Sequence, residues 1–519
     1  MSRNGLLRNT FIVAALTMLS RVLGLVREMF QSAFIGAGVE QSAFALAFAV
    51  PNMVRKLFGE GALTAAFVPV FRGEVEAVGL EKAQRLARAV MTTVLVVLMA
   101  VVALTLAALV TVQGFADTWG FSDRTRLVLR LVTILVPYML AICGAAFGMG
   151  VLNALGRFKA SGFMPALLNI VWIAALASLL FVPNWTVVQR IEYVSGAILM
   201  GGFVQMIFMF TAMRRAGVSP RPLFSGWGAP KVRLVWHNLG IAAFGAGAVQ
   251  LNYLLDQVLA QWASPWAAGV IGFAERLMDL PLGVIGVAFG TVLLPTFADC
   301  FARRDEDGAR AALLGAVKSQ LFVMVPAAAG LAVLAPEVTR VIYERGEFDA
   351  LATTRVARAL AVYAGGLGFF GLQKSLIPWF QAQNDMRTPL RVSVETVILN
   401  ATLNLLAVAF LPEAWRHVGL AGSTVLCALF ACVLLARRAK AKNGSLGLSA
   451  SVSPVLRILF SALVMAMVLG GLKSRVVGLG PYLGLALLIG VGALVYFLFT
   501  AALFRGELKT LLPARRRRK

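Results

Sequence analysis

Long, continuous apolar stretches are the feature that most limits what this chain can fold into. Of its 519 residues, 59% are hydrophobic and only 14% are charged. A soluble domain is about half apolar and a quarter charged. A helix that spans a bilayer needs roughly 20 apolar residues, and the runs here reach that length without the alternation of a β-barrel strand. The sequence therefore predicts an all-α polytopic membrane protein.

Apolar periodicity and length predict about fourteen transmembrane helices. Most of the 48 Lys and Arg residues fall in every second connecting segment or near the ends of the chain. Because cytoplasmic loops carry the excess of Lys and Arg, this asymmetry predicts that both termini are cytoplasmic. The expected spans cover residues 9–35, 42–71, 89–113, 127–152, 163–183, 190–213, 233–261, 266–298, 315–336, 356–382, 389–412, 417–436, 454–472 and 479–504.

The chain also shows a weak internal repeat. Pro165 and Pro389 are 224 residues apart, and Pro69 and Pro295 are 226 apart. The segments "VPNMVRKLFGEGALTAAFVPVF" and "LPLGVIGVAFGTVLLPTF" share early proline, central glycine and a final P-x-F. A common offset predicts two pseudo-repeated six-helix lobes, a known transporter plan. We expect an N-lobe over 1–216, a cytoplasmic linker over 217–232, a C-lobe over 233–440, and two further helices with a basic tail over 441–519.

Composition and motifs exclude several other classes of function. The net charge of +24 is typical of cytoplasmic loops in a multi-span protein, so we expect no nucleic-acid partner. The four cysteines form no CxxC pair, and the two histidines lie far apart, so no metal site is expected. No GxxxxGK[ST], GxSxG or HExxH motif occurs, which disfavours an ATPase or a hydrolase. We expect a secondary transporter, a lipid scramblase or a flippase, and no enzyme.

Cations inside the predicted spans are the strongest functional signal. Each costs roughly 2.5–3.5 kcal/mol at the centre of the bilayer, so such groups face a bundle interior or a water-filled cavity. Lys56 could pair with Glu60 at i,i+4, and Arg276 with Asp279 at i,i+3, so both remain open to a purely structural interpretation. The cations concerned are Arg21, Arg27, Arg55, Lys56, Arg276 and Lys374.

Arg21 and Arg27 are harder to explain by local pairing. Six residues separate them, which is about 120° around a helix, so they cannot share one partner without a bend. Gly24 lies between them, where a helix can deform. Glu28 follows Arg27 directly, but adjacent residues on a helix do not face each other, so we expect no pairing there. Surplus positive charge in a cavity indicates an anionic ligand such as phosphate or pyrophosphate.

Asp256, in "QLNYLLDQVLAQ", is an acid within a predicted span. It could bind a coupling cation or make a structural polar contact. The prolines and glycines of the two repeated segments predict broken or bending helices, which suit a transporter that opens to either side. Close helix packing is the alternative role for these glycines.

The motifs "SRVLGLVRE", "FAFAVPNMVRKLFGEGALTAAFVPVF", "ERLMDLPLGVIGVAFGTVLLP" and "FQAQNDMRTP" resemble the bacterial MurJ/MviN family of lipid II flippases. That family belongs to the multidrug/oligosaccharidyl-lipid/polysaccharide exporter superfamily. The resemblance covers essentially the whole chain in order. It implies two six-helix lobes around a cationic cavity, and a groove for a polyprenyl tail formed by the last two helices.

The resemblance also implies roles for individual residues. Arg21, Arg27, Arg55 and Arg276 match the family's substrate-binding cavity arginines. One departure is mild, since the family has Arg-Asp where this chain has Arg27-Glu28. Ser42 stands where some members carry an acid, so that acid's role does not transfer. Residues expected to support the cavity or its gating are Ser20, Gly24, Glu28, Lys56, Glu60, Glu275 and Asp279, with Asp256 as a candidate ion site.

The resulting hypothesis is export of lipid II across the bacterial cytoplasmic membrane by alternating access, without a bound cofactor. A coupling cation, sodium or a proton, is left open. Expected partners are lipid II, membrane lipids, and proteins of cell-wall synthesis and division. The alternatives are a flippase for another polyprenyl-pyrophosphate-linked glycan, a multidrug cation antiporter and a non-transporting scaffold. The surplus of arginines argues against the antiporter.

Overall fold

The structure is a computed structural model that describes residues 3–59, 62–290, 292–447 and 451–504. The described residues form α-helices and two short 3₁₀ helices, with no β-strand among them. The all-α prediction is therefore confirmed for the part of the chain that the structure covers.

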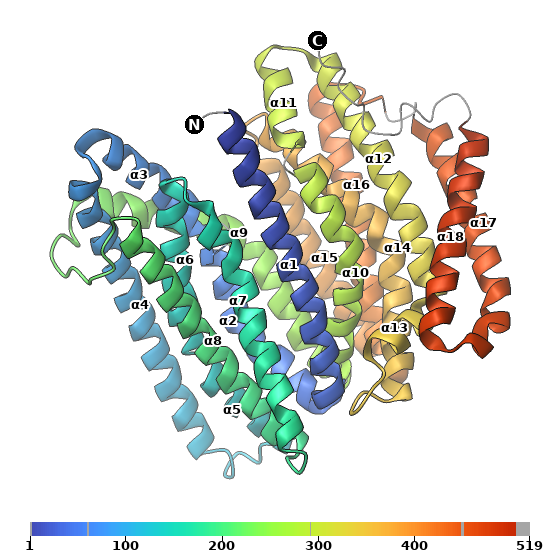
Figure 1. Cartoon of the computed structure of the whole chain (residues 1–519), viewed down its shortest axis with the longest axis horizontal. Helices are drawn as coiled ribbons and strands as arrows, with labels where there is room; N and C mark the ends of the chain where they lie inside the picture. The colour runs from blue at the N-terminus through green and yellow to red at the C-terminus, as the bar shows by residue number, and fades with distance from the viewer. Residues whose placement is uncertain (1–2, 60–61, 291, 448–450, 505–519) are drawn as a thin grey trace. The chain divides into compact units, whose positions relative to one another are not determined.

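Contacts divide the chain into two compact units. Unit 1 is Met1–Gln261 with the short segment Arg345–Phe348, and unit 2 is Trp262–Glu344 with Asp349–Lys519. The helices of unit 1 are α1 (Arg3–Ile35), α2 (Val39–Gly59), α3 (Ala62–Val78), α4 (Leu80–Gly114), α5 (Asp123–Leu135), α6 (Tyr138–Ala154), α7 (Phe158–Ser178), η1 (Leu179–Phe181), α8 (Val187–Arg215) and α9 (Pro230–Ala263), whose last residues fall in unit 2 (Figure 1).

Unit 2 carries the remaining helices. They are α10 (Ala267–Gly290), α11 (Leu293–Ala302), α12 (Glu306–Val333), α13 (Ala335–Tyr343), α14 (Ala350–Gln381), α15 (Arg387–Phe410), α16 (Glu413–Asn443), α17 (Val452–Val476), η3 (Val477–Leu479) and α18 (Pro481–Leu503).

Ten helical segments of the described chain are long and apolar enough to cross a membrane. These ten correspond to predicted spans, and α5 with α6 counts as one of them. The other predicted spans coincide with α1, with α2 and α3, with α9, and with α10 and α11. The multi-pass architecture is thus confirmed, while the total of about fourteen spans stays a prediction.

Each of the second and eighth predicted spans is described as two helices, and the break or bend predicted there falls on residues 60–61 and 291, which lie outside the described residues. In one, α2 ends at Gly59 and α3 begins at Ala62; in the other, α10 ends at Gly290 and α11 begins at Leu293. Each of the two spans has a proline inside both of its described helices. The two repeated sequence segments thus share this arrangement of helices and prolines, and the predicted pair of six-helix lobes stays a prediction.

The core of unit 1 combines aromatic side chains with small residues. Phe67 stacks on Phe71 with ring centroids 5.1 Å apart, and Phe147 of α6 completes this cluster. Where α6 meets α8, a Cβ added at Gly202 would lie 2.6 Å from the ring of Tyr138. Such close approach of helices through small residues is the usual packing mode in membranes.

Helix α9 belongs with unit 1 because its side chains bond to that unit. Trp236 donates from Nε1 to Oγ1 of Thr93 at 3.1 Å, and Lys231 pairs with Glu74. The predicted lobe boundaries, with a linker over 217–232 and a C-lobe from 233, stay predictions. Residues 217–229 do form the non-helical connection between α8 and α9.

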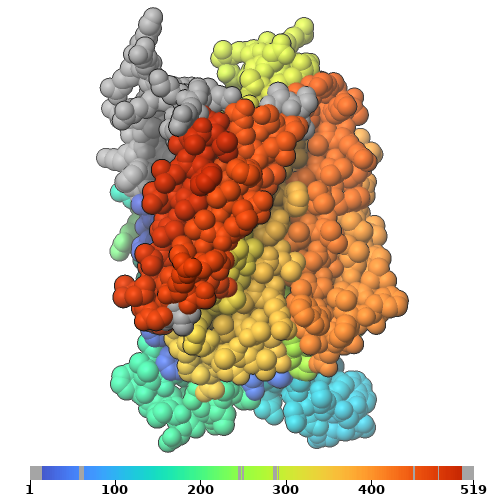
Figure 2. Space-filling view, turned by 90° about the vertical axis from the view of Figure 1, so that its right-hand side faces the viewer, coloured from blue at the N-terminus to red at the C-terminus, as the bar shows by residue number. Residues whose placement is uncertain are grey.

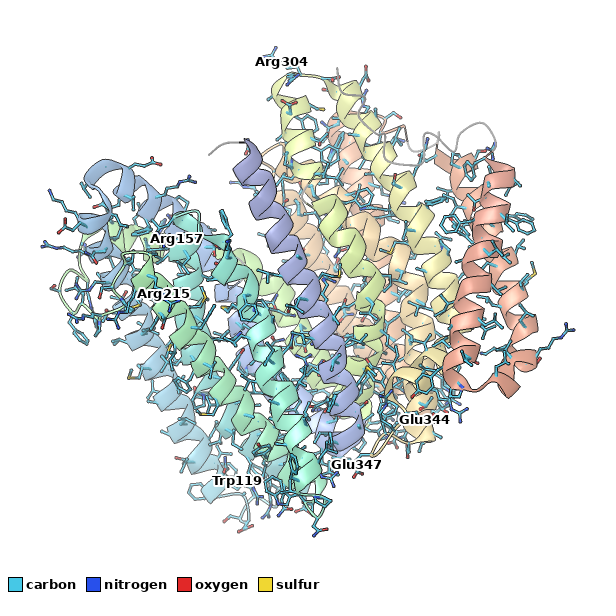
Figure 3. All side chains as sticks on the ribbon, viewed as in Figure 1. Trp119, Arg157, Arg215, Arg304, Glu344 and Glu347 are labelled. Atoms are coloured by element: carbon cyan, nitrogen blue, oxygen red, sulfur yellow. The ribbon has the colours of Figure 1, made fainter. Side chains whose placement is uncertain are left out.

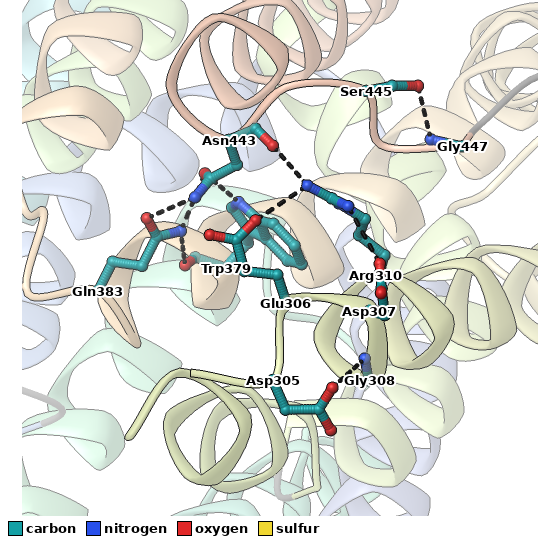
Figure 4. A network of polar contacts seen from close by, with 10 residues as sticks. All are labelled: Asp305, Glu306, Asp307, Gly308, Arg310, Trp379, Gln383, Asn443, Ser445 and Gly447. Carbon is teal, nitrogen blue, oxygen red and sulfur yellow. Dashed lines mark hydrogen bonds and ion pairs between the residues drawn. The ribbon is translucent and has the colours of Figure 1, made fainter. Parts of the chain in front are cut away.

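In unit 2, helix ends are joined around Asn443, the last residue of α16 (Figure 4). Its Oδ1 accepts hydrogen bonds from Trp379 Nε1 at 3.2 Å and Gln383 Nε2 at 3.3 Å. Arg310 of α12 donates to the Asn443 carbonyl oxygen at 2.8 Å. These bonds fix the point from which the chain leads on to α17 and α18.

Those last two helices pack on each other and on α12. Figure 2 shows them as a ridge that crosses one face of unit 2 obliquely, beside the surface of the α12–α14 region. An apolar pocket of about 410 Å³ lies where α17 and α18 meet α10, α12 and α13. Its lining residues include Pro281, Phe322, Ala327, Gly330, Met465 and Tyr496.

Candidate functional site

Arg27 lies on α1 and is held on three sides. Its guanidinium donates to Asn169 Oδ1 at 3.1 Å, forms an ion pair with Glu28, and lies 4.3 Å from the ring centroid of Trp172. The side chains of Arg27 and Glu28 are each only 12% exposed. Pairing with a carboxylate, an amide and an aromatic face reduces the cost of keeping this cation within a membrane.

The expectation that Glu28 would not pair with Arg27 is wrong. Adjacent Cβ atoms do diverge on a helix. The arginine side chain is nevertheless long enough to curve along the helix surface, and Asn169 and Trp172 from α7 hold it in that position. Contacts with α7 therefore decide where the Arg27 side chain lies, and residue spacing along α1 alone does not.

Asn169 connects Arg27 to an earlier turn of α1. Its Nδ2 donates to the backbone oxygen of Ser20 at 3.0 Å and reaches the Ser20 hydroxyl at 3.4 Å, while its Oδ1 accepts from Arg27. A Cβ added at Gly24 would be 3.8 Å from Asn169 Nδ2. Helix α1 runs unbroken through Gly24, so a bend at that residue stays a prediction.

Behind Arg27, polar and aromatic side chains extend the site into α2. Trp172 donates from Nε1 to Gln31 Oε1 at 3.2 Å, and Gln31 donates from Nε2 to Gln41 Oε1 at 2.9 Å. Phe44 and Phe48 of α2 meet the Trp172 ring edge-on, each with centroids 5.7 Å apart. Arg27 is thus fixed by a network that spans α1, α2 and α7.

Arg21 has a different environment from Arg27. It is exposed and lines a pocket of about 340 Å³ between α1, the end of α6 and the start of α7. Thr17 and Ser20 line the same pocket, and so do Asn153 and Ser161. The Asn153 Oδ1 and Ser161 Oγ atoms are buried without a hydrogen-bond partner. Arg21 therefore borders a small pocket whose surface is mostly apolar but which carries hydroxyl and amide groups able to bond to a ligand.

Arg55 and Lys56, also in unit 1, are half-buried on α2. Arg55 donates from Nε to Asn52 Oδ1 at 3.0 Å, one turn earlier on the helix. The ammonium of Lys56 lies 4.6 Å from the ring centroid of Tyr253 on α9. Glu60, the expected partner of Lys56, lies outside the described residues, so that pairing stays a prediction.

The candidate residues of unit 2 lie on α10. Arg276 and Asp279 are exposed, and Glu275 is half-buried. Glu275 Oε1 accepts a hydrogen bond from the Tyr363 hydroxyl of α14 at 3.3 Å. The side chain of Glu275 is therefore engaged by a neighbouring helix, and Arg276 is presented at the surface of the unit.

Asp256, the candidate ion ligand, is half-buried on α9 and accepts from Asn252 Nδ2 at 3.1 Å. In the described part of the chain, no three His, Cys, Asp or Glu side chains are grouped to hold a metal ion.

Ser42, where some relatives carry an acid, is buried at the start of α2. Its backbone oxygen accepts from Gln261 Nε2 at 2.7 Å. The Gln261 backbone oxygen accepts in turn from Arg124 at 2.9 Å. The Gln261 amide and the Arg124 guanidinium thus join α2, α5 and α9 beside Ser42.

Sequence reasoning missed the partners of Arg27 on α7. Asn169 and Trp172 are polar or amphipathic residues three apart in an apolar span, which places them on one helix face. That spacing was the available signal. The spacing does not indicate which face of α1 the Asn169 and Trp172 side chains contact.

Comparison with known proteins gives consistent matches. The family model described as lipid II flippase MurJ matches residues 31–490. A probable lipid II flippase MurJ of Rhizobium tropici is 34% identical over 422 residues, which is 80% of this chain and 78% of that protein. A lipid II flippase MurJ of Burkholderia cenocepacia is 31% identical over 435 residues, covering 82% of each chain.

Solved structures share the fold. A structure described as lipid II flippase MurJ in an inward closed conformation aligns with a TM-score of 0.76 and 21% identity, over 95% of this chain and 99% of that one. An inward-facing multidrug resistance MATE transporter of the MOP superfamily aligns with a TM-score of 0.68 and 14% identity, over 83% and 98%.

Proposed function

The chain belongs to the lipid II flippase MurJ family, and we propose that it moves lipid II from the inner to the outer leaflet of the bacterial cytoplasmic membrane. The observation that carries this proposal is the pair Arg21 and Arg27 on α1, one exposed beside a pocket that carries hydroxyl and amide groups and the other held by α7. A flippase must receive a pyrophosphate inside the membrane, and guanidinium groups bind phosphate oxygens in a bidentate manner.

In this proposal the exposed arginines contact the headgroup directly. Arg21 lines the pocket that also contains the hydroxyls of Thr17 and Ser20. Arg276 is exposed on α10, and Arg55 is half-buried on α2. We propose that each of these arginines contacts the pyrophosphate or the adjoining sugar during transport.

Arg27 has a second role in this proposal. Because it already bonds to Glu28 and Asn169, it is less available to substrate than Arg21. We propose that phosphate competes with Glu28 for Arg27, and that this exchange loosens the contact between α1 and α7. The substrate would then change the helix packing by the same interaction that recognises it.

The polyprenyl tail would lie in the apolar pocket of unit 2. That pocket is bordered by α10, α12, α13, α17 and α18, and its described lining is almost wholly apolar. Since the tail is as apolar as lipid, it gains little from leaving the bilayer, and a groove at the protein surface suffices. The predicted tail groove along the last two helices is thus retained as part of the proposal.

The driving force is proposed to be the membrane potential or an ion gradient. One charge moved across 100 mV is worth about 2.3 kcal/mol. Asp256 is the proposed position for a coupling cation, either sodium or a proton. Loss of coupling in an Asp256→Asn variant, with transport still detectable, would support that position; an unchanged ion dependence would remove it.

We further propose that both termini are cytoplasmic, in keeping with the distribution of Lys and Arg. Contacts with proteins of cell-wall synthesis and division are proposed as well, since the substrate is consumed on the outer face.

Genetic complementation tests the function. The chain should restore growth to a strain depleted of its lipid II flippase. Binding of lipid II should also exceed binding of other polyprenyl-pyrophosphate glycans in a competition assay. Restoration of growth with a clear preference for another glycan would favour the alternative substrate; failure of a well-folded, membrane-inserted chain to restore growth would contradict the proposal.

A further inference from the structure

A second pocket, of about 520 Å³, lies at one end of unit 1 where α6, α7 and α8 meet. Its rim carries Arg157, Lys159 and Arg215, and its interior carries Leu152, Phe163 and Phe208. Figure 3 labels Arg157 and Arg215 at the same end of this unit. None of these residues belongs to the Arg21 and Arg27 site.

We propose that this pocket binds an anionic membrane phospholipid, with the phosphate on the three cations and an acyl chain along Phe163 and Phe208. This lipid would stay bound to the protein, and it would be distinct from the transported substrate.

The rim has no acid to neutralise it. The sequence contains no Asp or Glu between Asp123 and Glu192, or between Glu192 and Asp256. No ion pair in the described residues involves a rim cation. The rim therefore keeps its positive charge, and an anion from outside the protein is the complementary partner.

The backbone places these cations together. Gly156 has φ of +73°, a left-handed turn between α6 and α7 that glycine adopts without strain. Arg157 follows it and donates from its guanidinium to the Arg215 backbone oxygen at 3.1 Å, at the end of α8. Helix α7 begins at Phe158 without a side-chain cap, so its first N–H groups add further donors at this end.

The interior of the pocket suits a hydrocarbon chain better than a free ion. Phe163 of α7 and Phe208 of α8 are half-buried, with ring centroids 5.9 Å apart. They continue the pocket from the charged rim towards the middle of the two helices. A free phosphate would use only the rim, whereas a phospholipid fits both parts.

We place the pocket at the level of a membrane surface, because its rim residues lie at the ends of two candidate membrane spans. Helices α7 and α8 both qualify as membrane spans, and the rim occupies the end of each. At the opposite end of the unit, Trp119 contacts Phe115 and Phe121, an aromatic group typical of the other membrane interface (Figure 3). Basic pockets between spans on the cytoplasmic side are where anionic headgroups bind.

The test uses the full chain in neutral detergent and two probes, phosphatidylglycerol and phosphatidylcholine of the same chain length. Binding is measured by titration. The double variant Lys159→Gln with Arg215→Gln preserves the bond from Arg157, because that bond ends on a backbone oxygen. The matched control is Arg214→Gln with Arg221→Gln, two cations outside the pocket that give an equal change of charge.

We expect the unmodified chain to prefer phosphatidylglycerol, and the double variant to bind it about thirtyfold more weakly, from about 1 kcal/mol for each cation lost. The control should keep its affinity. Equal loss in both variants, or no loss in either, would overturn the site. Full displacement of the lipid by inorganic phosphate would also overturn it, since the acyl chain would then contribute nothing.

A third variant distinguishes loss of a lipid contact from general misfolding. Phe163→Ala leaves all rim cations in place and should weaken binding of the long-chain lipid but not of its dihexanoyl analogue. If Phe163→Ala bound each of the two lipids as tightly as the unmodified chain does, the proposed acyl-chain position would be contradicted.

Discussion

At the scale of single residues, the main result is that two arginines on one helix have different surroundings. Arg21 is exposed beside a small pocket, and Arg27 is enclosed by Glu28, Asn169 and Trp172. The sequence located both cations, because charges within apolar runs are rare and costly. It could not distinguish their surroundings, since the contacts of Arg27 come from side chains of α7.

Gly24 offers a test of whether α1 must bend. A Cβ at this position would meet Asn169 Nδ2 at an ordinary contact distance of 3.8 Å, so Gly24→Ala should fold normally. Alanine favours the straight helix, so transport should slow severalfold if α1 bends during the cycle. Transport by reconstituted protein is the measurement. Gly365→Ala on α14, where a Cβ meets nothing within 4 Å, is the control; equal rates in both variants would argue against a bend.

Asp385, in the loop between α14 and α15, gives a prediction about pH. A hydrogen bond from Lys442 lowers the pKa of this carboxyl to about 2, helped by bonds from Thr388 and opposed by partial burial. A carboxyl with a lowered folded-state pKa stabilises the protein above its unfolded pKa of about 3.9, and that contribution is lost as pH falls towards 2.

The unmodified chain should therefore unfold at a higher temperature than Asp385→Asn at pH 6, with the difference shrinking between about pH 4 and pH 2. Thermal unfolding in detergent across this range is the measurement. A difference that stays constant down to pH 2 would show that the carboxylate charge is not the stabilising factor.

At the scale of helices, the structure agrees best with the sequence where the backbone preferences of individual residues determine the local conformation. The two repeated segments each carry two described helices, α2 with α3 and α10 with α11. In "FQAQNDMRTP", Asn384 takes a positive φ of 57° and Asp385 accepts from the first turn of α15. That motif is thus a turn and cap, which explains its residues without a direct role in transport.

Asn443 is predicted to stabilise unit 2 without taking part in transport. Asn443→Ala would leave the indole N–H of Trp379 without its acceptor, and Trp379 is only 1% exposed. The expected loss is about 1–3 kcal/mol of unfolding free energy, with transport retained below the unfolding temperature. Thermal unfolding should detect it, with Ser445→Ala as an exposed control. An unchanged unfolding temperature for Asn443→Ala would contradict this role.

The apolar pocket of unit 2 can be tested at the same scale. Ala327 lines it, so Ala327→Phe should fill part of its 410 Å³ and slow transport of a long-tailed substrate. The matched control is Ala409→Phe, at an exposed position of α15. Transport of a short-tailed lipid II analogue should be less affected. Equal slowing of both substrates, or none, would remove the pocket from the tail pathway.

At the scale of the whole molecule, the fold class and the family followed from the sequence, while the predicted lobe boundaries stay predictions. Apolar length predicted the helices, and positive charge predicted their orientation. The predicted linker at 217–232 marks where the chain leaves α8, yet α9 bonds to unit 1 through Trp236 and Lys231. Those bonds join residues more than 140 positions apart, and no local pattern encodes them.

The central claim is that cations of α1 recognise the substrate inside the membrane. Arg27 is the sharpest place to test it, because Arg27→Lys keeps the charge but loses the planar fork that bonds to Asn169 and Glu28. Arg27→Ala loses both charge and fork. Comparison of the two separates the need for charge from the need for geometry.

The most direct measurement is transbilayer movement of labelled lipid II in vesicles that contain the purified chain, Arg27→Lys or Arg27→Ala, at equal amounts of folded protein. The account predicts transport by the unmodified chain, a reduced rate for Arg27→Lys, and no transport above empty vesicles for Arg27→Ala. Transport by folded Arg27→Ala at the rate of the unmodified chain would contradict it.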